Sequence, residues 1–184
     1  MKHRRRRLTF SPVARQKNPV LATSRTQLTL LVPEPAASVL EEVRRRVDPA
    51  QAALVPAHVT LAREDELTGL DAVRARLRAG RLSPLTLVLG CPEIFGGHGL
   101  LLPCTGGRDA YHALRSAVLG AGARGEATPH LTLAHPRNVR APGNALLETR
   151  GLPGAMRVTF RAVHLVEQAG EGPWRKLERF ALAG

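Results

Sequence analysis

Two short segments of this chain repeat one another. The sequence HVTLA occupies residues 58–62, and HLTLA occupies residues 130–134. In a β-strand, side chains at i and i+2 project from the same face, about 6.6 Å apart along the chain. The histidine and the threonine of each segment therefore share one face, while the aliphatic residues between them point into a core. If two such strands face one another across a groove, two imidazoles and two hydroxyls converge on one small volume.

The residue types of this repeat suit acid–base chemistry on a phosphate. Imidazole titrates near neutral pH, so one ring can take up a proton while the other supplies one. A threonine hydroxyl can donate a hydrogen bond to an oxygen of a bound anion. His58, Thr60, His130 and Thr132 therefore predict metal-free hydrolysis or transfer of a phosphodiester. The alternative is that each histidine is a satisfied strand residue and each threonine an ordinary β-former, which explains one copy better than it explains two.

The elements that must position these residues alternate irregularly between strand and helix. Period-two and helical patterns predict a mixed α+β fold in which strands often pair locally. A Gly-rich segment at residues 96–99 is expected to be a hairpin turn rather than a phosphate-binding loop. Expected strands cover residues 26–33, 55–62, 84–90, 99–103, 127–136 and 156–167, with a closing partner near 174–182. Expected helices cover residues 36–47, 68–79 and 108–120. In the first of these helices, Val39, Leu40 and Val43 are expected on one side.

Composition and charge bound the remaining possibilities. The chain has 184 residues with 43% hydrophobic and 23% charged residues, as expected for one compact domain. No run approaches the ~18 apolar residues of a membrane span. Eight of the 27 basic residues and no acidic residue lie in residues 1–25, which we expect to be a disordered tail preceding a single domain at 26–184. The two cysteines are too few for a disulfide framework, so a cytoplasmic location is expected.

The histidines and cysteines outside the repeat do not form a recognisable metal motif. No Cys/His pair has zinc-finger spacing, and His130 with His135 does not form a helical HExxH arrangement. We therefore expect no metal and no cofactor.

The paired HVTL and HLTL segments resemble the signature of the 2H (two-histidine) phosphoesterase superfamily, which includes the 2′-5′ RNA ligase or RNA 2′,3′-cyclic phosphodiesterase proteins. The resemblance covers residues 26–184, including Pro129 before the second motif and the closing hairpin. It implies a bilobal fold with pseudo-two-fold symmetry, in which antiparallel sheets line a central groove and helices lie outside.

The resemblance also implies roles for the motif residues. His58 would contact the departing 3′ oxygen of a 2′,3′-cyclic phosphate, and His130 would be the partner of water and phosphate, giving a 2′-phosphate product. In reverse, the same pair would join a cyclic end to a 5′-hydroxyl and form a 2′-5′ linkage. Thr60 and Thr132 would hold the non-bridging oxygens as charge develops.

The chain departs from many relatives at two places. Five residues after the first histidine, where many carry an aromatic residue, it has Arg63; five after the second, where many carry an arginine, it has His135, with Arg137 two residues further. These three residues are the candidates for binding phosphate or substrate. We predict that Arg63 supplies the principal cation, which requires the strand to end near Ala62 and the chain to turn.

Three functions follow from these residues. The first is a 2′,3′-cyclic phosphodiesterase or ligase acting on RNA. The second keeps the chemistry but acts on a small cyclic nucleotide or ADP-ribose cyclic phosphate. The third is a non-catalytic RNA-binding protein that depends on its basic tail. Intact paired motifs argue against the third. In each case we expect a monomer without a membrane partner.

Overall fold

The computed structural model describes residues 24–123, 127–137 and 146–184. The tail predicted at residues 1–25 therefore lies almost entirely outside the described residues, and the first strand begins at Ser24. The strands are β1 (Ser24–Leu31), β2 (His58–Ala62), β3 (Leu85–Leu89), β4 (Glu93–Phe95), β5 (Gly99–Gly106), β6 (His130–Ala134), β7 (Met156–Phe160), β8 (Ala162–Ala169) and β9 (Arg175–Ala181). The helices are α1 (Ala36–Val47), α2 (Pro49–Leu54), α3 (Leu70–Ala79) and α4 (Arg108–Leu119), with short 3₁₀ turns η1 (Glu64–Glu66), η2 (Gly120–Gly122) and η3 (Leu146–Thr149).

The strands of the described residues form one curled antiparallel sheet. Its order is β7-β3-β5-β6-β2-β1-β8-β9, and β4 also pairs with β5, at residues Gly99–Leu101. The order divides into two groups of four strands, and the two strands that carry the repeated motif meet at the centre. This confirms the predicted α+β fold with two lobes related by a pseudo-two-fold axis.

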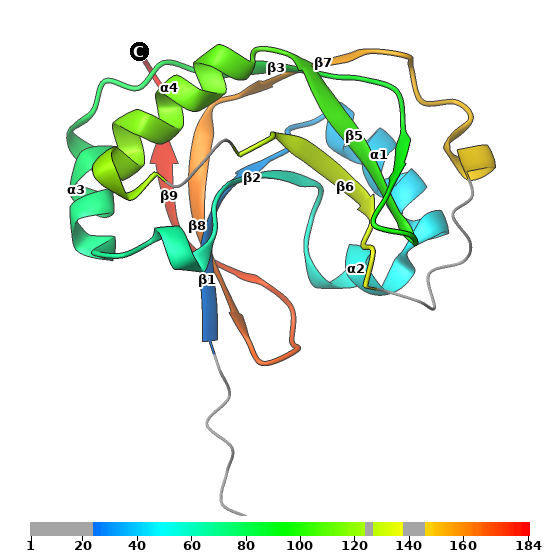
Figure 1. Cartoon of the computed structure of the whole chain (residues 1–184), viewed down its shortest axis with the longest axis horizontal. Helices are drawn as coiled ribbons and strands as arrows, with labels where there is room; N and C mark the ends of the chain where they lie inside the picture. The colour runs from blue at the N-terminus through cyan, green and yellow to red at the C-terminus, as the bar shows by residue number, and fades with distance from the viewer. Residues whose placement is uncertain (1–23, 124–126, 138–145) are drawn as a thin grey trace, which may run out of the picture.

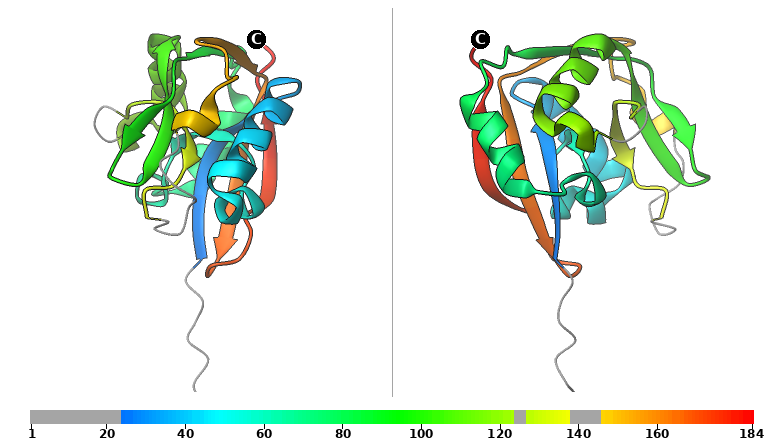
Figure 2. Two further views of the ribbon diagram at one scale, coloured as in Figure 1. Left: turned by 90° about the vertical axis from the view of Figure 1, so that its right-hand side faces the viewer. Right: turned by 60° about the vertical axis from the view of Figure 1, so that its left-hand side comes forward.

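The helices cover the two ends of the curled sheet. α1 and α2 lie on the side of β5 and β6, while α3 lies beside β9 and α4 packs next to α3 (Figures 1 and 2). Contacts join α1 to β6, and α4 to both β2 and β3. Each motif strand is therefore backed by a helix. No helix in the described part of the chain is long and apolar enough to cross a membrane.

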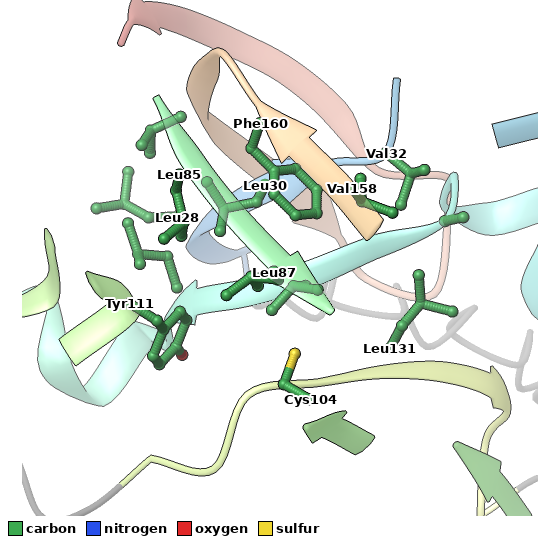
Figure 3. Packing of buried hydrophobic residues seen from close by; sticks show 14 of the residues in the cluster. Leu28, Leu30, Val32, Leu85, Leu87, Cys104, Tyr111, Leu131, Val158 and Phe160 are labelled. Carbon is green, nitrogen blue, oxygen red and sulfur yellow. The ribbon is translucent and has the colours of Figure 1, made fainter. Parts of the chain in front are cut away.

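The core forms because the strands alternate in burial. Leu28 and Leu30 of β1 are fully buried, and Leu85 and Leu87 of β3 are at most 2% exposed. These side chains pack together with Val158 and Phe160 of β7 and with Leu131 of β6 (Figure 3). Because the aliphatic residues of both motifs join this one cluster, the face of β2 and β6 that carries histidine and threonine is fixed as the opposite face.

Two details differ from the sequence-based expectations. The strand expected over residues 156–167 is two strands, because exposed Arg161 separates β7, which pairs with β3, from β8, which pairs with β1 and β9. In α1, Val39 is 42% exposed, and the buried stripe is instead Leu40, Val43, Arg44 and Val47. An arginine occupies a core position of this helix because its guanidinium finds buried partners, described below.

Candidate active site

The two motifs are brought together by direct pairing of their strands. β2 and β6 are antiparallel neighbours, with Val59 opposite Leu131. In an antiparallel pair the next residues on either side also lie opposite one another, so His58 faces Thr132 and Thr60 faces His130. The four side chains form a two-by-two patch in which the two histidine residues are diagonal neighbours, roughly 7–8 Å apart. The pairing therefore brings the four predicted side chains to one face of two neighbouring strands.

The burial of the two motifs is the same residue by residue. In both strands the histidine and the threonine are partly exposed, while the following aliphatic residues are buried. The neighbouring strands frame the patch with small or apolar residues: Leu31 lies opposite His58, and Leu101 and Pro103 lie opposite Thr132 and His130. Thr29 of β1 lies opposite Thr60.

Backbone carbonyls fix the tautomer of both histidines. The Nδ1 atom of His58 lies 2.7 Å from the carbonyl oxygen of Pro56, and that of His130 lies 2.9 Å from the carbonyl oxygen of Thr128. A carbonyl oxygen only accepts, so Nδ1 must carry the proton in each ring. The neutral ring then presents Nε2 as an acceptor, which is the arrangement a general base requires. Both motifs use the same contact, to the residue two positions upstream.

His58 lies in a more enclosed and more positive environment than an ordinary histidine. Burial, together with smaller contributions from Arg44 and His130, lowers its pKa from 6.5 to about 4, although the bond to Pro56 acts in the opposite direction. His58 is therefore neutral at neutral pH in the free protein.

The lowered pKa of His58 predicts a specific dependence of stability on pH. Its neutral form is favoured by folding, so its contribution is complete above pH 6.5 and is lost between pH 6.5 and about 4, where only the unfolded chain takes up the proton. The free energy of unfolding in urea should therefore fall less for His58→Gln than for the wild type as the pH is lowered from 6.5 to about 4. His98→Gln, in the exposed hairpin turn, should keep the wild-type pH dependence; the same dependence in both variants would contradict this environment for His58.

A buried ion pair on α1 holds the segment that enters the first motif. Arg44 is 2% exposed; its guanidinium bonds Glu41 at 2.8 Å and donates to the carbonyl oxygen of Val55 at 2.8 Å. Glu41 in turn accepts a hydrogen bond from the backbone N–H of Ala57. The carbonyl of Pro56, which orients His58, thus lies between two residues whose backbone groups are fixed by one helix.

A second buried network on α4 holds the other end of the same strand. The Tyr111 hydroxyl donates to the carbonyl oxygen of Thr60 at 2.7 Å, and Arg115 donates to that of Leu61. Arg115 also pairs with Glu66, whose carboxylate accepts the backbone N–H of Arg63 at 3.2 Å. β2 is therefore fixed at both ends by groups that are almost wholly buried.

The three further candidate residues lie at opposite ends of the patch. β2 ends at Ala62 and the chain turns into η1, so exposed Arg63 follows the strand at the end where Thr60 faces His130. His135 follows β6 at the other end, and its backbone N–H donates to Asp48 at 2.9 Å. The backbone N–H of exposed Arg137 donates to Nδ1 of His135 at 3.2 Å. Burial, and then the charge of Arg137, lowers the pKa of His135, which makes it a poor cation at neutral pH.

A third histidine on this face of the sheet did not emerge from the motif analysis. His164 of β8 lies opposite Thr29 of β1, which in turn lies opposite Thr60. Burial lowers the pKa of His164, and its Nδ1 atom is buried without a hydrogen-bond partner. Its strand position in an alternating sequence gave no sign of this placement, because only the pairing through β1 brings it into line with the motif.

Comparison with known families agrees with this geometry. A family model described as the 2′-5′ RNA ligase superfamily matches residues 32–172. The chain belongs to the 2′-5′ RNA ligase superfamily. The predicted resemblance to 2H phosphoesterases is thereby confirmed, and the matched region contains both motifs. No curated protein matches the sequence significantly.

Solved structures with the same fold include members of this superfamily. E. coli LigT complexed with ATP superposes with a TM-score of 0.59 at 19% identity, over 88% of this chain and 99% of that one. LigT complexed with phosphate gives 0.55 at 19% identity, over 88% and 98%. A structure described as a phosphoesterase gives 0.58 at 17% identity, over 88% and 100%. At these identities the likeness establishes the fold.

Proposed function

We propose that this member of the 2′-5′ RNA ligase superfamily opens 2′,3′-cyclic phosphate ends of RNA without a metal, giving a 2′-phosphate, and that it can also join such an end to a 5′-hydroxyl in a reversible 2′-5′ ligation. The pairing of Val59 with Leu131 carries the proposal. That register supports the proposal because it makes the two motif strands direct neighbours.

The hydrolysis begins with activation of water by a neutral imidazole. His58 fits this step because Arg44 and burial keep its ring neutral and its Nδ1 proton is held by Pro56. Its Nε2 atom takes a proton from the water as the water oxygen bonds to phosphorus. This assigns the base to His58 and reverses the roles implied by the family resemblance, which gave the water to His130.

The second half of the reaction needs a proton for the leaving group. His130 enters this step as the imidazolium, with protons on both Nδ1 and Nε2. As the bond from phosphorus to the 3′ oxygen breaks, it gives the Nε2 proton to that oxygen, leaving a 3′-hydroxyl, a 2′-phosphate and a neutral ring. Thr60 and Thr132 donate hydrogen bonds to the non-bridging oxygens, whose negative charge grows in the transition state. In the ligation direction, a 5′-hydroxyl takes the place of water.

A substrate panel tests the proposal. It contains 2′,3′-cyclic mononucleotides, oligoribonucleotides with a cyclic end and ADP-ribose cyclic phosphate, each with excess EDTA and with product identification. We expect turnover of cyclic-ended oligoribonucleotides at least as efficient as that of the mononucleotides. Efficient turnover restricted to ADP-ribose cyclic phosphate or to mononucleotides would replace RNA with a small substrate, and loss of activity in EDTA would contradict the metal-free mechanism.

The proposal makes Arg63 the principal phosphate cation. Arg63→Ala should lower kcat/KM roughly 30-fold. This corresponds to about 2 kcal/mol of transition-state stabilisation, which is the strength of a hydrogen bond to a charged group. Arg63→Lys should recover only part, since an ammonium lacks the bidentate geometry of a guanidinium. Arg137→Ala should be nearly silent in the same assay. The opposite ranking would move the phosphate cation to the loop after the second motif.

A further inference from the structure

The aromatic side chains of the described residues divide into buried and accessible ones. Tyr111, Phe160 and Phe180 are buried, with exposures of 1%, 1% and 6%. Trp174 is partly exposed, and the guanidinium of Arg25 lies over its ring at 5.6 Å. Phe95 is also partly exposed, and its ring centroid lies 6.1 Å from that of His130, with the planes inclined by 56°. Within the described part of the chain, Phe95 is thus the accessible aromatic ring that contacts a motif histidine.

The β4–β5 hairpin holds the Phe95 ring in this place. Phe95 lies opposite Gly99, and the turn between them contains Gly96 and Gly97 with φ of 56° and 85°, which favour glycine. A Cβ added to Gly99 would lie 2.5 Å from Cε1 of Phe95, so the glycine leaves the space that the ring occupies. Because β5 pairs directly with β6, the hairpin is tied to the strand that carries His130.

We infer that Phe95 forms the wall against which the nucleobase of the substrate packs while the cyclic phosphate lies over the two motifs. The inference rests on the proposed function and specifies its substrate as a nucleotide end rather than any cyclic phosphodiester. The base of a nucleotide lies one ribose away from its cyclic phosphate, and Phe95 lies next to the histidine that acts on that phosphate. All bases have a flat apolar face that stacks on aromatic rings, so this wall selects for a base without selecting which one.

The absence of an aromatic residue after the first motif strengthens this assignment. Arg63 stands at the position where many relatives carry an aromatic ring, and it lies beside negatively charged Glu64 and Asp65. The accessible ring at this patch therefore comes from the other lobe, on the hairpin next to β6. The competing role for Phe95 is to orient the ring of His130, in which case its removal would affect every phosphodiester equally.

Kinetics on substrates with and without a base separate these two roles. We expect Phe95→Ala to lower kcat/KM for 2′,3′-cyclic AMP about 5- to 150-fold, mainly through KM, since stacking of one base contributes about 1–3 kcal/mol. Turnover of ribose 2′,3′-cyclic phosphate, which has no base, should be unchanged. The variant Phe95→Tyr keeps an aromatic ring and should retain the activity on the nucleotide. Ile94→Ala, at the exposed neighbouring position, should behave as the wild type. Equal losses on both substrates, or no loss on the nucleotide, would overturn the inference.

A binding measurement keeps this inference separate from the proposed reaction. Calorimetric titration with 2′-AMP and with ribose 2-phosphate requires no turnover. The inference predicts that Phe95→Ala weakens binding of 2′-AMP at least about fivefold and leaves ribose 2-phosphate unaffected. If the wild type turns over neither cyclic substrate, the proposed function is wrong, and the titration still decides the role of Phe95. Equal affinity of the wild type and Phe95→Ala for 2′-AMP, or no binding of 2′-AMP by the wild type, would overturn the inference that Phe95 packs against the base.

Discussion

Replacing either motif histidine with alanine is expected to lower kcat/KM for a 2′,3′-cyclic nucleotide by about a hundredfold or more. Each imidazole handles a different proton of the same displacement, and one positioned acid or base contributes about 10²–10⁴-fold. Because the two rings act as a unit, the double variant should be little worse than the more damaged single variant. Steady-state kinetics of His58→Ala, His130→Ala and the double variant provide the measurement.

The matched control for the histidines is His98→Ala. His98 lies exposed in the turn of the β4–β5 hairpin, outside the patch formed by the motifs. His98→Ala should retain full activity. All of the variants should give the circular dichroism spectrum of the wild type, which shows that they keep its fold. Full activity in either His58→Ala or His130→Ala would exclude a mechanism that uses both rings.

Removing the buried guanidinium of Arg115 is expected to destabilise the protein by about 3–5 kcal/mol. The Arg115 side chain is 4% exposed and that of its partner Glu66 is 9% exposed, so Arg115→Met removes one member of a buried ion pair. The carbonyl oxygen of Leu61 also loses its donor. Urea unfolding at neutral pH measures this loss directly.

Two further variants distinguish burial from pairing in this network. Arg115→Met combined with Glu66→Gln should be more stable than Arg115→Met alone, because the buried carboxylate charge is then removed together with the guanidinium. Arg46→Met breaks the pair with Glu42, whose side chains are 40% and 68% exposed, and should cost at most about 1 kcal/mol. A loss in Arg115→Met no larger than that in Arg46→Met would show that the network does not hold β2.

The repeated motif could be predicted from the sequence because its signal is local. The alternation of His58, Val59, Thr60 and Leu61 reports both the strand and its two faces, and the second copy does the same. The helix over residues 36–47 was predicted with the bounds that the structure has. That the two motif strands pair directly did not follow from the pattern, since register between distant strands depends on the whole sheet.

The buried charges could not be predicted from the sequence. Arg44 and Arg115 look like ordinary charged residues of amphipathic helices, yet both are inside, because their partners come from other elements: the carbonyls of Val55 and Leu61 and, for Arg115, Glu66. Phe95 was missed for a similar reason. Its significance depends on the pairing of β4, β5 and β6, which brings a ring from a short edge hairpin to His130.

The most direct test of the proposed active site is the identity of the product from 2′,3′-cyclic AMP. Phosphorus NMR during incubation with the wild-type protein and excess EDTA follows the cyclic phosphate and both monophosphates in one sample. We expect the cyclic resonance to be replaced by that of 2′-AMP alone, and to persist unchanged with His130→Ala over the same period. Equal conversion by the wild type and His130→Ala would contradict hydrolysis at the paired motifs, and formation of 3′-AMP would contradict departure of the 3′ oxygen.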